Sequence, residues 1–298
     1  MTTDDAAGRI TIERFEDAAA FLEAAIPFLV AREAAHNLIL GIASSLIIDP
    51  GRLRGTPYLA LARRAGTPVG AAVMTPPFNV VLSCMDDEAA VGAFAGDLAD
   101  RGPGAAPPPG VTGPVEVAAA FGRAWAPPRE LAVHGAIRER IYQIERLIPP
   151  RPSPGTARLA TMADRDLIVA WCAAFLAEAL GRADPAEAVA IVDRGMRTGS
   201  RTFYLWDDGG PVSLAGVNGP TPNGIRIGPV YTPPERRGQG YASAVTAAAT
   251  QAQFDAGRRA VFLFTDLANP TSNKIYQAIG YEPVIDVDQL SFEGIDTA

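Results

Sequence analysis

The chain has 298 residues, nearly half of them apolar, and a formal net charge of −7. This length suits two domains of about 150 residues, each able to bury its own core. The acidic balance argues against a nucleic-acid partner held through phosphates, because such binding requires a basic surface. It is compatible with a cationic or amine substrate.

Cysteine usage and the N-terminus bear on the compartment. Cys84 and Cys172 lie far apart and form no CxxC or Cys/His cluster, so we expect free thiols and no metal site. The acidic start Met1–Asp5 lacks the apolar region of a signal peptide. Charges interrupt every apolar stretch before eighteen residues, so we expect no membrane partner and a cytoplasmic protein. Nothing in the sequence indicates an oligomeric state.

The first half alternates short strands with amphipathic helices. Its patterns predict, in chain order, a strand at 10–15, helices at 18–28 and 33–46, strands at 58–64, 69–74 and 79–83, and a helix from Asp87. The Pro/Gly-rich stretch 102–114 is predicted to be a surface loop. Within the second helix, His36 and Asn37 are expected to be structural, the alternative being that they face a cleft.

A run of four prolines and a glycine marks the predicted domain boundary at 149–155, because such a run continues neither a helix nor a central strand. An extended, stiff linker is the simplest interpretation. The predicted domains are therefore 1–148 and 156–298.

The second half indicates an α+β domain with a mixed sheet, because hairpins occur together with one strand–helix–strand crossover. Thr161 and Asp164 resemble a capping pair, and Gly257 is expected just past a helix end. The elements predicted from the patterns are strands at 158–160, 202–206, 212–217, 225–232, 261–265, 282–284 and 288–292, with helices at 164–180, 185–195, 241–256 and 270–280. The similar element order of the two halves suggests two domains of one type.

The segment 227–242 combines a strand, a tight loop and a helix start. Gly238 and Gly240 let backbone N–H groups turn toward one point at a helix N-terminus, where the dipole favours an anion. Arg236 or Arg237 adds positive charge, and the small Ala242 leaves room for a bulky group. These features predict a diphosphate cradle, although a glycine-rich turn with surface arginines would look the same.

The segment 264–281 carries a second group of candidates. Asn269 before Pro270 forms a good N-cap followed by proline at the first helical position, which is its plain structural role. Tyr276 lies beside the core positions Ile275 and Ile279, so a buried tyrosine is its plain role.

Together these two segments resemble the GNAT superfamily of N-acetyltransferases, from about Thr156 to the C-terminus. The family's loop R-x-x-G-x-[GA] matches Arg237, Gly240 and Ala242. The family's later pattern N-x-x-[SA]-x-x-x-Y-x-x-x-G-[FY] matches Asn269, Ser272, Tyr276, Gly280 and Tyr281. The whole chain resembles two-domain members with a degenerate N-terminal copy. The resemblance implies tandem domains, each a mixed, mostly antiparallel sheet flanked by helices.

The resemblance also implies a mechanism. A bulge splays the fourth strand from the fifth, and the pantetheine arm of acetyl-CoA lies in the gap. A backbone N–H near Val230 or Tyr231 polarises the thioester carbonyl, the amine attacks directly, and Tyr276 protonates the leaving thiolate. The residues implied in binding acetyl-CoA are Val230, Tyr231, Thr232, Arg236, Arg237, Gly238, Gln239, Gly240, Tyr241, Ala242, Asn269 and Ser272.

An ammonium acceptor must first lose a proton. Both histidines, His36 and His134, lie in the first half, which leaves four carboxylate candidates unranked: Glu178, Asp266, Asp286 and Asp288.

The first half is expected to lack a second site, because Asp86-Asp87-Glu88 would face the diphosphate with like charge and no glycine. It would shape the acceptor cleft or pack the sheet. The alternative functions are a non-catalytic acyl-CoA-binding or sensor protein, which would need no Tyr276, and an interaction module with a vestigial site.

Overall fold

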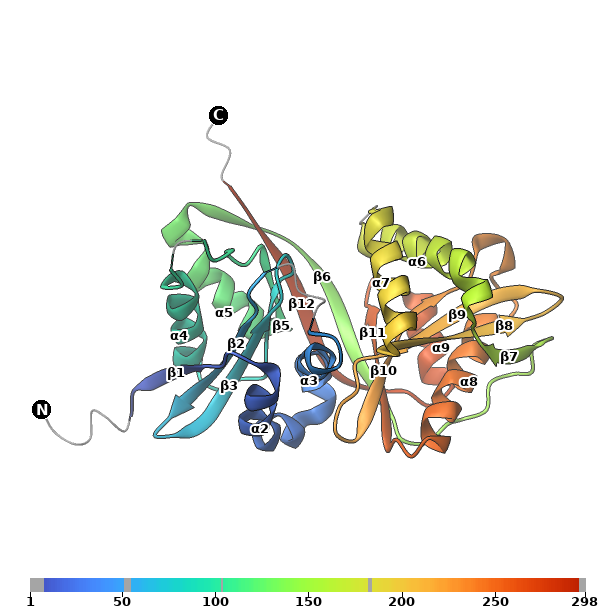
Figure 1. The fold of residues 1–298 in the computed structure, drawn as a ribbon, viewed down its shortest axis with the longest axis horizontal. Helices are drawn as coiled ribbons and strands as arrows, with labels where there is room; N and C mark the ends of the chain where they lie inside the picture. The colour runs from blue at the N-terminus through green and yellow to red at the C-terminus, as the bar shows by residue number, and fades with distance from the viewer. Residues whose placement is uncertain (1–7, 51–54, 103, 182–183, 295–298) are drawn as a thin grey trace, which may run out of the picture. The chain divides into compact units, whose positions relative to one another are not determined.

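The structure is a computed structural model that describes residues 8–50, 55–102, 104–181 and 184–294, so the acidic start Met1–Asp5 lies outside the described residues (Figure 1). The chain folds into two compact units. Unit 1 runs to Arg140 and resumes at Ile285, and unit 2 is Ile141–Val284. Within the described residues, no helix is long and apolar enough to cross a membrane.

Unit 1 is a twisted sheet with helices on both faces. Its strands lie in the order β1-β2-β3-β4-β5-β12-β6, with the pair β4/β5 parallel and the pairs from β1 to β4 antiparallel. The elements are β1 (Ile10–Arg14), α2 (Ala18–Leu29), α3 (Glu33–Ile48), β2 (Tyr58–Arg64), β3 (Thr67–Met74), β4 (Val80–Leu82), α4 (Glu88–Ala99), β5 (Gly110–Pro114), α5 (Val115–Trp125), β6 (Leu131–Ile144) and β12 (Glu282–Gly294).

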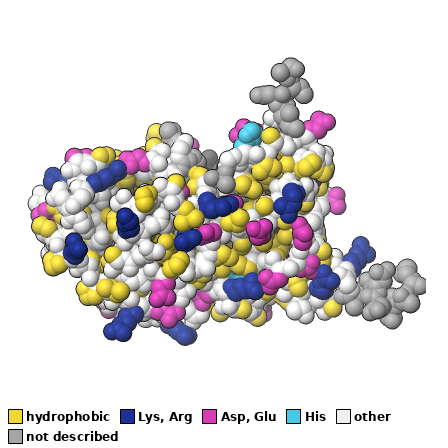
Figure 2. All heavy atoms as spheres, turned by 180° about the vertical axis from the view of Figure 1, so that it is seen from behind, with side chains coloured by type: hydrophobic (Ala, Val, Ile, Leu, Met, Phe, Trp, Pro, Cys, Tyr) yellow, Lys and Arg dark blue, Asp and Glu magenta, His cyan; other side chains and the backbone are white. Residues whose placement is uncertain are grey.

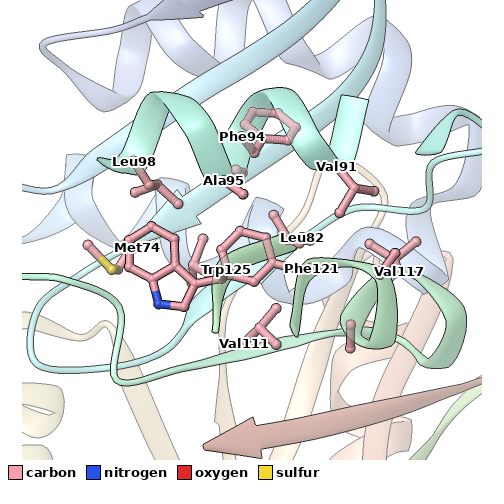
Figure 3. Packing of buried hydrophobic residues seen from close by; sticks show 14 of the residues in the cluster. Met74, Leu82, Val91, Phe94, Ala95, Leu98, Val111, Val117, Phe121 and Trp125 are labelled. Carbon is pink, nitrogen blue, oxygen red and sulfur yellow. The ribbon is translucent and has the colours of Figure 1, made fainter. Parts of the chain in front are cut away.

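Alternation along β2 divides the core of unit 1 into two layers. Leu59 and Leu61 point toward α2 and α3, whereas Ala60 and Ala62 point toward α4 and α5. This period of two is what a strand buried on both faces produces. Figure 3 shows the second layer, where residues of α4 and α5 meet side chains of the sheet around Trp125.

Unit 2 repeats this plan. Its strands lie in the order β12-β6-β11-β10-β9-β8-β7, with β10 and β11 parallel and the pairs from β7 to β10 antiparallel. The remaining elements are β7 (Thr156–Leu159), α6 (Arg165–Leu180), α7 (Pro185–Thr198), β8 (Arg201–Asp207), β9 (Pro211–Asn218), β10 (Gly224–Tyr231), α8 (Tyr241–Asp255), β11 (Ala260–Asp266) and α9 (Pro270–Ala278). The predicted α+β class with a mixed, mostly antiparallel sheet is confirmed.

Helices α6 and α7 cover one face of this sheet, and α8 and α9 cover the other. The predicted capping pair is present, because Thr161 and Asp164 form a reciprocal capping box. Gly257 follows α8 with φ +86°, as a residue past a helix end commonly does.

The two units exchange their last strands, which differs from the predicted boundaries at 148 and 156. Strand β6 begins in unit 1 and ends in unit 2, and β12 does the reverse. In unit 1, β12 inserts between β5 and β6; in unit 2, β6 inserts between β12 and β11. The proline run 149–155 therefore joins two strand positions within unit 2 instead of separating two domains.

Two predicted elements need correction. The stretch 102–114 is not all loop, since Gly110–Pro114 forms the internal strand β5, paired with β12 from Val287 to Ser291. The strands predicted at 282–284 and 288–292 are one continuous strand, β12. Its charged residues pair bidentately with β6: Arg138 with Asp288, and Arg140 with Asp286.

His36 is structural, as predicted. Its buried ring spans two backbone groups: Nε2 accepts from the Cys84 N–H (3.0 Å), which leaves Nδ1 to donate to the Leu29 carbonyl (2.9 Å). Burial lowers the pKa of His36, and the nearby Arg32 acts in the same direction. Asn37 is also buried and donates to the carbonyl of Ala34. Both described cysteines, Cys84 and Cys172, are free and buried.

Unit 1 should lose stability as the pH falls below about 6.5, the ordinary histidine pKa. In this range His36 binds a proton in the unfolded chain but stays neutral in the folded one, so acidification favours unfolding. The free energy of unfolding should change with pH by a slope that corresponds to at most one proton. Urea titrations between pH 7.5 and 5.5 measure this slope. His36→Gln should flatten this slope relative to the unmodified chain. Equal slopes in His36→Gln and the unmodified chain would contradict the assignment.

Candidate functional site

Strands β10 and β11 of unit 2 are hydrogen-bonded to each other along only part of their length. Their parallel pairing runs from Gly224↔Ala260 to Arg226↔Phe262. Strand β10 continues to Tyr231 and β11 to Asp266, but no further pairing joins these described ends. Unpaired strand ends leave backbone groups available to a ligand that lies between them as an added strand.

A bulge in β10 accompanies this separation. Opposite β9, Ile227 pairs with Val217 and Val230 with Ala215, so β10 carries one extra residue between the two pairs. The Gly228 carbonyl at the bulge accepts from Arg201 (2.8 Å) and from the Asn218 amide (2.7 Å). Bulges bend a strand and increase its twist. The parallel pairing with β11 ends at Arg226, directly before this bulge.

The loop after β10 presents an open helix N-terminus. Gly238 and Gly240 adopt φ of +79° and +83°, and α8 begins at Tyr241 with no side-chain cap. Among the described residues, the first N–H of this helix with a backbone partner belongs to Ala244, which donates to the Gly240 carbonyl (3.0 Å). The N–H groups of the helix start before Ala244, together with the helix dipole, therefore offer a site for an anion.

Neighbouring segments hold this loop in place. The Ser153 hydroxyl, from the proline run, donates to the Gln239 carbonyl (3.1 Å), and a Cβ on Gly240 would lie 2.6 Å from its oxygen. The Tyr241 hydroxyl bonds to Asp208 and to the Gln239 side chain. The loop is thus fixed from outside, while Arg236, Arg237 and Gly238 stay exposed.

Arg237 folds back over the end of β10. Its Nε donates to the Thr232 carbonyl (2.9 Å), and its terminal nitrogen pairs with Glu178 of α6 (2.6 Å). The other Glu178 oxygen accepts from the Tyr231 hydroxyl (3.2 Å). Burial and the adjacent Glu178 raise the pKa of Tyr231, which keeps its phenol protonated.

The start of α9 is capped as predicted. The Asn269 side chain accepts from the Ser272 N–H (3.1 Å), and Pro270 takes the first helical position. These two candidates therefore contact each other through this cap. Asn273 is an anchor that the sequence did not reveal: its amide donates to the Asp266 and Asn269 carbonyls, and its oxygen accepts from the Tyr142 hydroxyl.

Tyr276 lies in the core between α8, α9 and the sheet, in a cluster against which Val230 packs. Burial raises its pKa, and no described residue forms a hydrogen bond with its hydroxyl. Its neighbour Tyr281 differs, because that hydroxyl is bonded to Thr250 (2.8 Å). The rings meet edge to face at 6.0 Å. Tyr276 thus combines a protonated phenol with a free hydroxyl.

The four carboxylates considered as proton acceptors for the amine have different surroundings. Asp266 accepts from the Ala268 N–H, while Asp286 and Asp288 belong to unit 1 and pair with arginines of β6. Only Glu178 among the four contacts the end of β10.

The equivalent helix start in unit 1 is already occupied. The Asp87 carboxylate caps α4 by accepting from the Ala89 N–H (3.0 Å), and it pairs with Arg64, which lowers its pKa. The neighbouring acids also have partners, since Asp86 pairs with Arg32 and Glu88 with Arg123. An internal carboxylate thus fills the place that stays open before α8.

On the face shown in Figure 2, basic and acidic side chains alternate among hydrophobic ones and form no continuous basic patch. Among the described residues, no group of three or more His, Cys, Asp or Glu side chains could hold a metal ion.

Comparison with known proteins identifies one family. Residues 168–281 match the model of the acetyltransferase (GNAT) family. No curated protein matches the chain.

Among the solved structures that resemble this chain, three cover 95% of it. A Drosophila protein has a TM-score of 0.65 at 12% identity, with 98% of that chain covered. A GNAT-family acetyltransferase from Colwellia psychrerythraea has 0.54 at 12%, with 100% covered. A tandem GNAT protein from the clavulanic acid biosynthesis pathway has 0.54 at 14%, with 97% covered. At these identities the likeness concerns the fold alone, and the two-domain layout is consistent with it.

Proposed function

Residues 168–281 form a domain of the GNAT acetyltransferase family, and on this basis we propose that the chain transfers an acetyl group from acetyl-CoA to a primary amine by direct attack in a ternary complex. The observation that carries the proposal is the pairing of an open helix N-terminus with splayed strands. Backbone N–H groups from Gly238 to Ala242 would hold the diphosphate, and Arg236 and Arg237 would add positive charge.

The gap between β10 and β11 would take the pantetheine arm. Val230 and Thr232 would bond it through their backbones, with Asn269 and Ser272 at its far side. An N–H near Val230 or Tyr231 would polarise the thioester carbonyl. Tyr276 would then donate its proton to the departing thiolate, for which its protonated, unbonded hydroxyl is suited. The proton that the attacking nitrogen releases would pass to water or to Glu178 at the end of β10.

Unit 1 is proposed to have no such site. The Asp87 cap places a negative charge where the diphosphate would bind, and no glycine opens the turn. One acetyl-CoA per chain is the stoichiometry that follows.

Gly238→Glu tests the proposal. Gly238 has open space around it, so its replacement puts a carboxylate at the loop without a clash, and its φ of +79° imposes the same kind of backbone strain as in the Gly257→Glu control. We expect acetyl-CoA affinity, measured by isothermal titration, to fall roughly tenfold or more, because the new charge opposes the phosphates at the helix start.

Gly257→Glu is the matched control. Gly257 has a similar left-handed conformation (φ +86°) and open surroundings but lies at the opposite end of α8. The Gly257→Glu variant should therefore bind acetyl-CoA with the same affinity as the unmodified protein. Absence of acetyl-CoA binding by the unmodified chain, or equal affinities in both variants, would refute the proposed site.

A further inference from the structure

A carboxylate and two aromatic rings gather at the end of β10. Trp171 and Glu178 lie two turns apart on one face of α6. The Trp171 ring stands 6.3 Å from that of Tyr231, and the Tyr231 hydroxyl donates to Glu178. All three residues belong to unit 2. A carboxylate beside aromatic faces is the chemistry that recognises an organic cation.

A cation already occupies this place. The Arg237 guanidinium pairs with Glu178 at 2.6 Å and stands 5.8 Å from the centre of the Tyr231 ring. It therefore makes both contacts expected of a bound ammonium ion. The three residues are here called the cation site, with Arg237 as its internal occupant.

The occupant is weakly held. Both side chains of the Arg237–Glu178 pair are nearly half exposed, at 48% and 47%. Solvent screens such pairs, so they contribute little to stability. A guanidinium binds a phosphate more strongly than an exposed carboxylate, because the anion carries more charge and more acceptor oxygens. A diphosphate at the neighbouring loop would therefore compete effectively for Arg237.

We infer that Glu178, Trp171 and Tyr231 bind the ammonium group of the acceptor, which attacks only after it has passed a proton to Glu178 or to water, and that Arg237 fills this cation site until the phosphates of acetyl-CoA draw it away. This inference rests on the proposed function and adds to it a substrate class, a cationic amine, and the residues that recognise it. It also couples the two substrates, since the amine gains its site when the cosubstrate takes Arg237.

Binding of n-butylammonium, followed by NMR titration, tests the inference without turnover, and uncharged n-butanol serves as the neutral probe. Arg237→Gln vacates the site, so it should bind n-butylammonium about fivefold or more tightly than the unmodified chain when no CoA is present. The double variant Arg237→Gln/Glu178→Gln should lose this gain. In the unmodified chain, saturating CoA should produce a similar gain.

The control Asp166→Asn removes a carboxylate from the same helix, where it is paired with Arg165, and should leave the gain of Arg237→Gln intact. Equal n-butylammonium affinity in Arg237→Gln and the double variant would overturn the inference. So would a gain for n-butanol of the same size. Because Arg237→Gln is measured without CoA, the cation site stands or falls separately from the proposed function, which fails if acetyl-CoA does not bind.

Discussion

Replacing Tyr276 with phenylalanine is expected to lower kcat by about two orders of magnitude while leaving the affinity for acetyl-CoA unchanged, as loss of a general acid does. The substitution removes one oxygen and keeps the ring that packs in the core cluster of unit 2. Without a proton donor, the thiolate must leave as an anion inside a buried site, which is costly.

The electrostatic setting of Tyr276 supports this role. Burial raises the pKa of its phenol, so the proton is present throughout the neutral and mildly basic range. If activity falls as the pH rises from neutral to about 10, the ordinary tyrosine pKa, deprotonation of Tyr276 should therefore not be the cause. Single-turnover rates with acetyl-CoA and a saturating amine, measured across this range, separate the chemical step from binding.

Tyr281→Phe is the matched control, because Tyr281 is also buried, its ring centre lies 6.0 Å from that of Tyr276, and its hydroxyl is bonded to Thr250. It should lose about 1 kcal/mol of stability with its hydrogen bond and keep its kcat. Unchanged transfer by Tyr276→Phe would remove Tyr276 from the reaction. A chain that binds acetyl-CoA and transfers nothing to any amine would favour the sensor alternative.

The local features of the site were readable from the sequence. The Asn269 cap, the proline after it, the capping box at Thr161 and the glycine after α8 depend on neighbours a few residues away, so residue type and spacing predict them. Gly238 and Gly240 were predicted to let the backbone of the loop turn, and both adopt positive φ angles.

The sequence did not predict contacts between residues that are far apart in the chain. Glu178 meets its partners Tyr231 and Arg237 across 53 and 59 residues, so nothing local distinguished it from three other carboxylates. Strand β5 was missed for a different reason. A Cβ on Gly110 would overlap the Leu290 carbonyl oxygen, so the glycine that suggested a loop is required by the close approach of β12.

The sequence did not predict the strand exchange either, because the exchange also depends on contacts between distant residues. The proline run gives a strong local signal, whereas the pairing of β12 with β5 joins residues far apart in the chain. The charged stretch 138–140 does not look like a central strand, and its partners Asp286, Asp288 and Gln289 come 146 to 150 residues later. Sequence order therefore suggested domains that the packing does not follow.

Phe292→Ala is expected to destabilise unit 1 by about 3–5 kcal/mol, although Phe292 lies at the far end of the chain. Its side chain is 9% exposed and packs in the unit 1 core, with its ring 6.2 Å from that of Phe121. Its N–H donates to the Pro109 carbonyl, which fixes β12 beside β5. Truncation leaves a cavity among large aromatic side chains that cannot all move inward to fill it.

Hydrogen exchange resolved by segment measures where the loss falls. Protection should drop in β2, β3 and α5 of unit 1, while the described residues of α8 and β11 keep theirs and acetyl-CoA still binds. Val284→Ala, a half-exposed position of β12 within unit 2, is the control and should change little. If Phe292→Ala instead lowered protection in unit 2 alone, the domains would follow the order of the sequence and β12 would not be an exchanged strand.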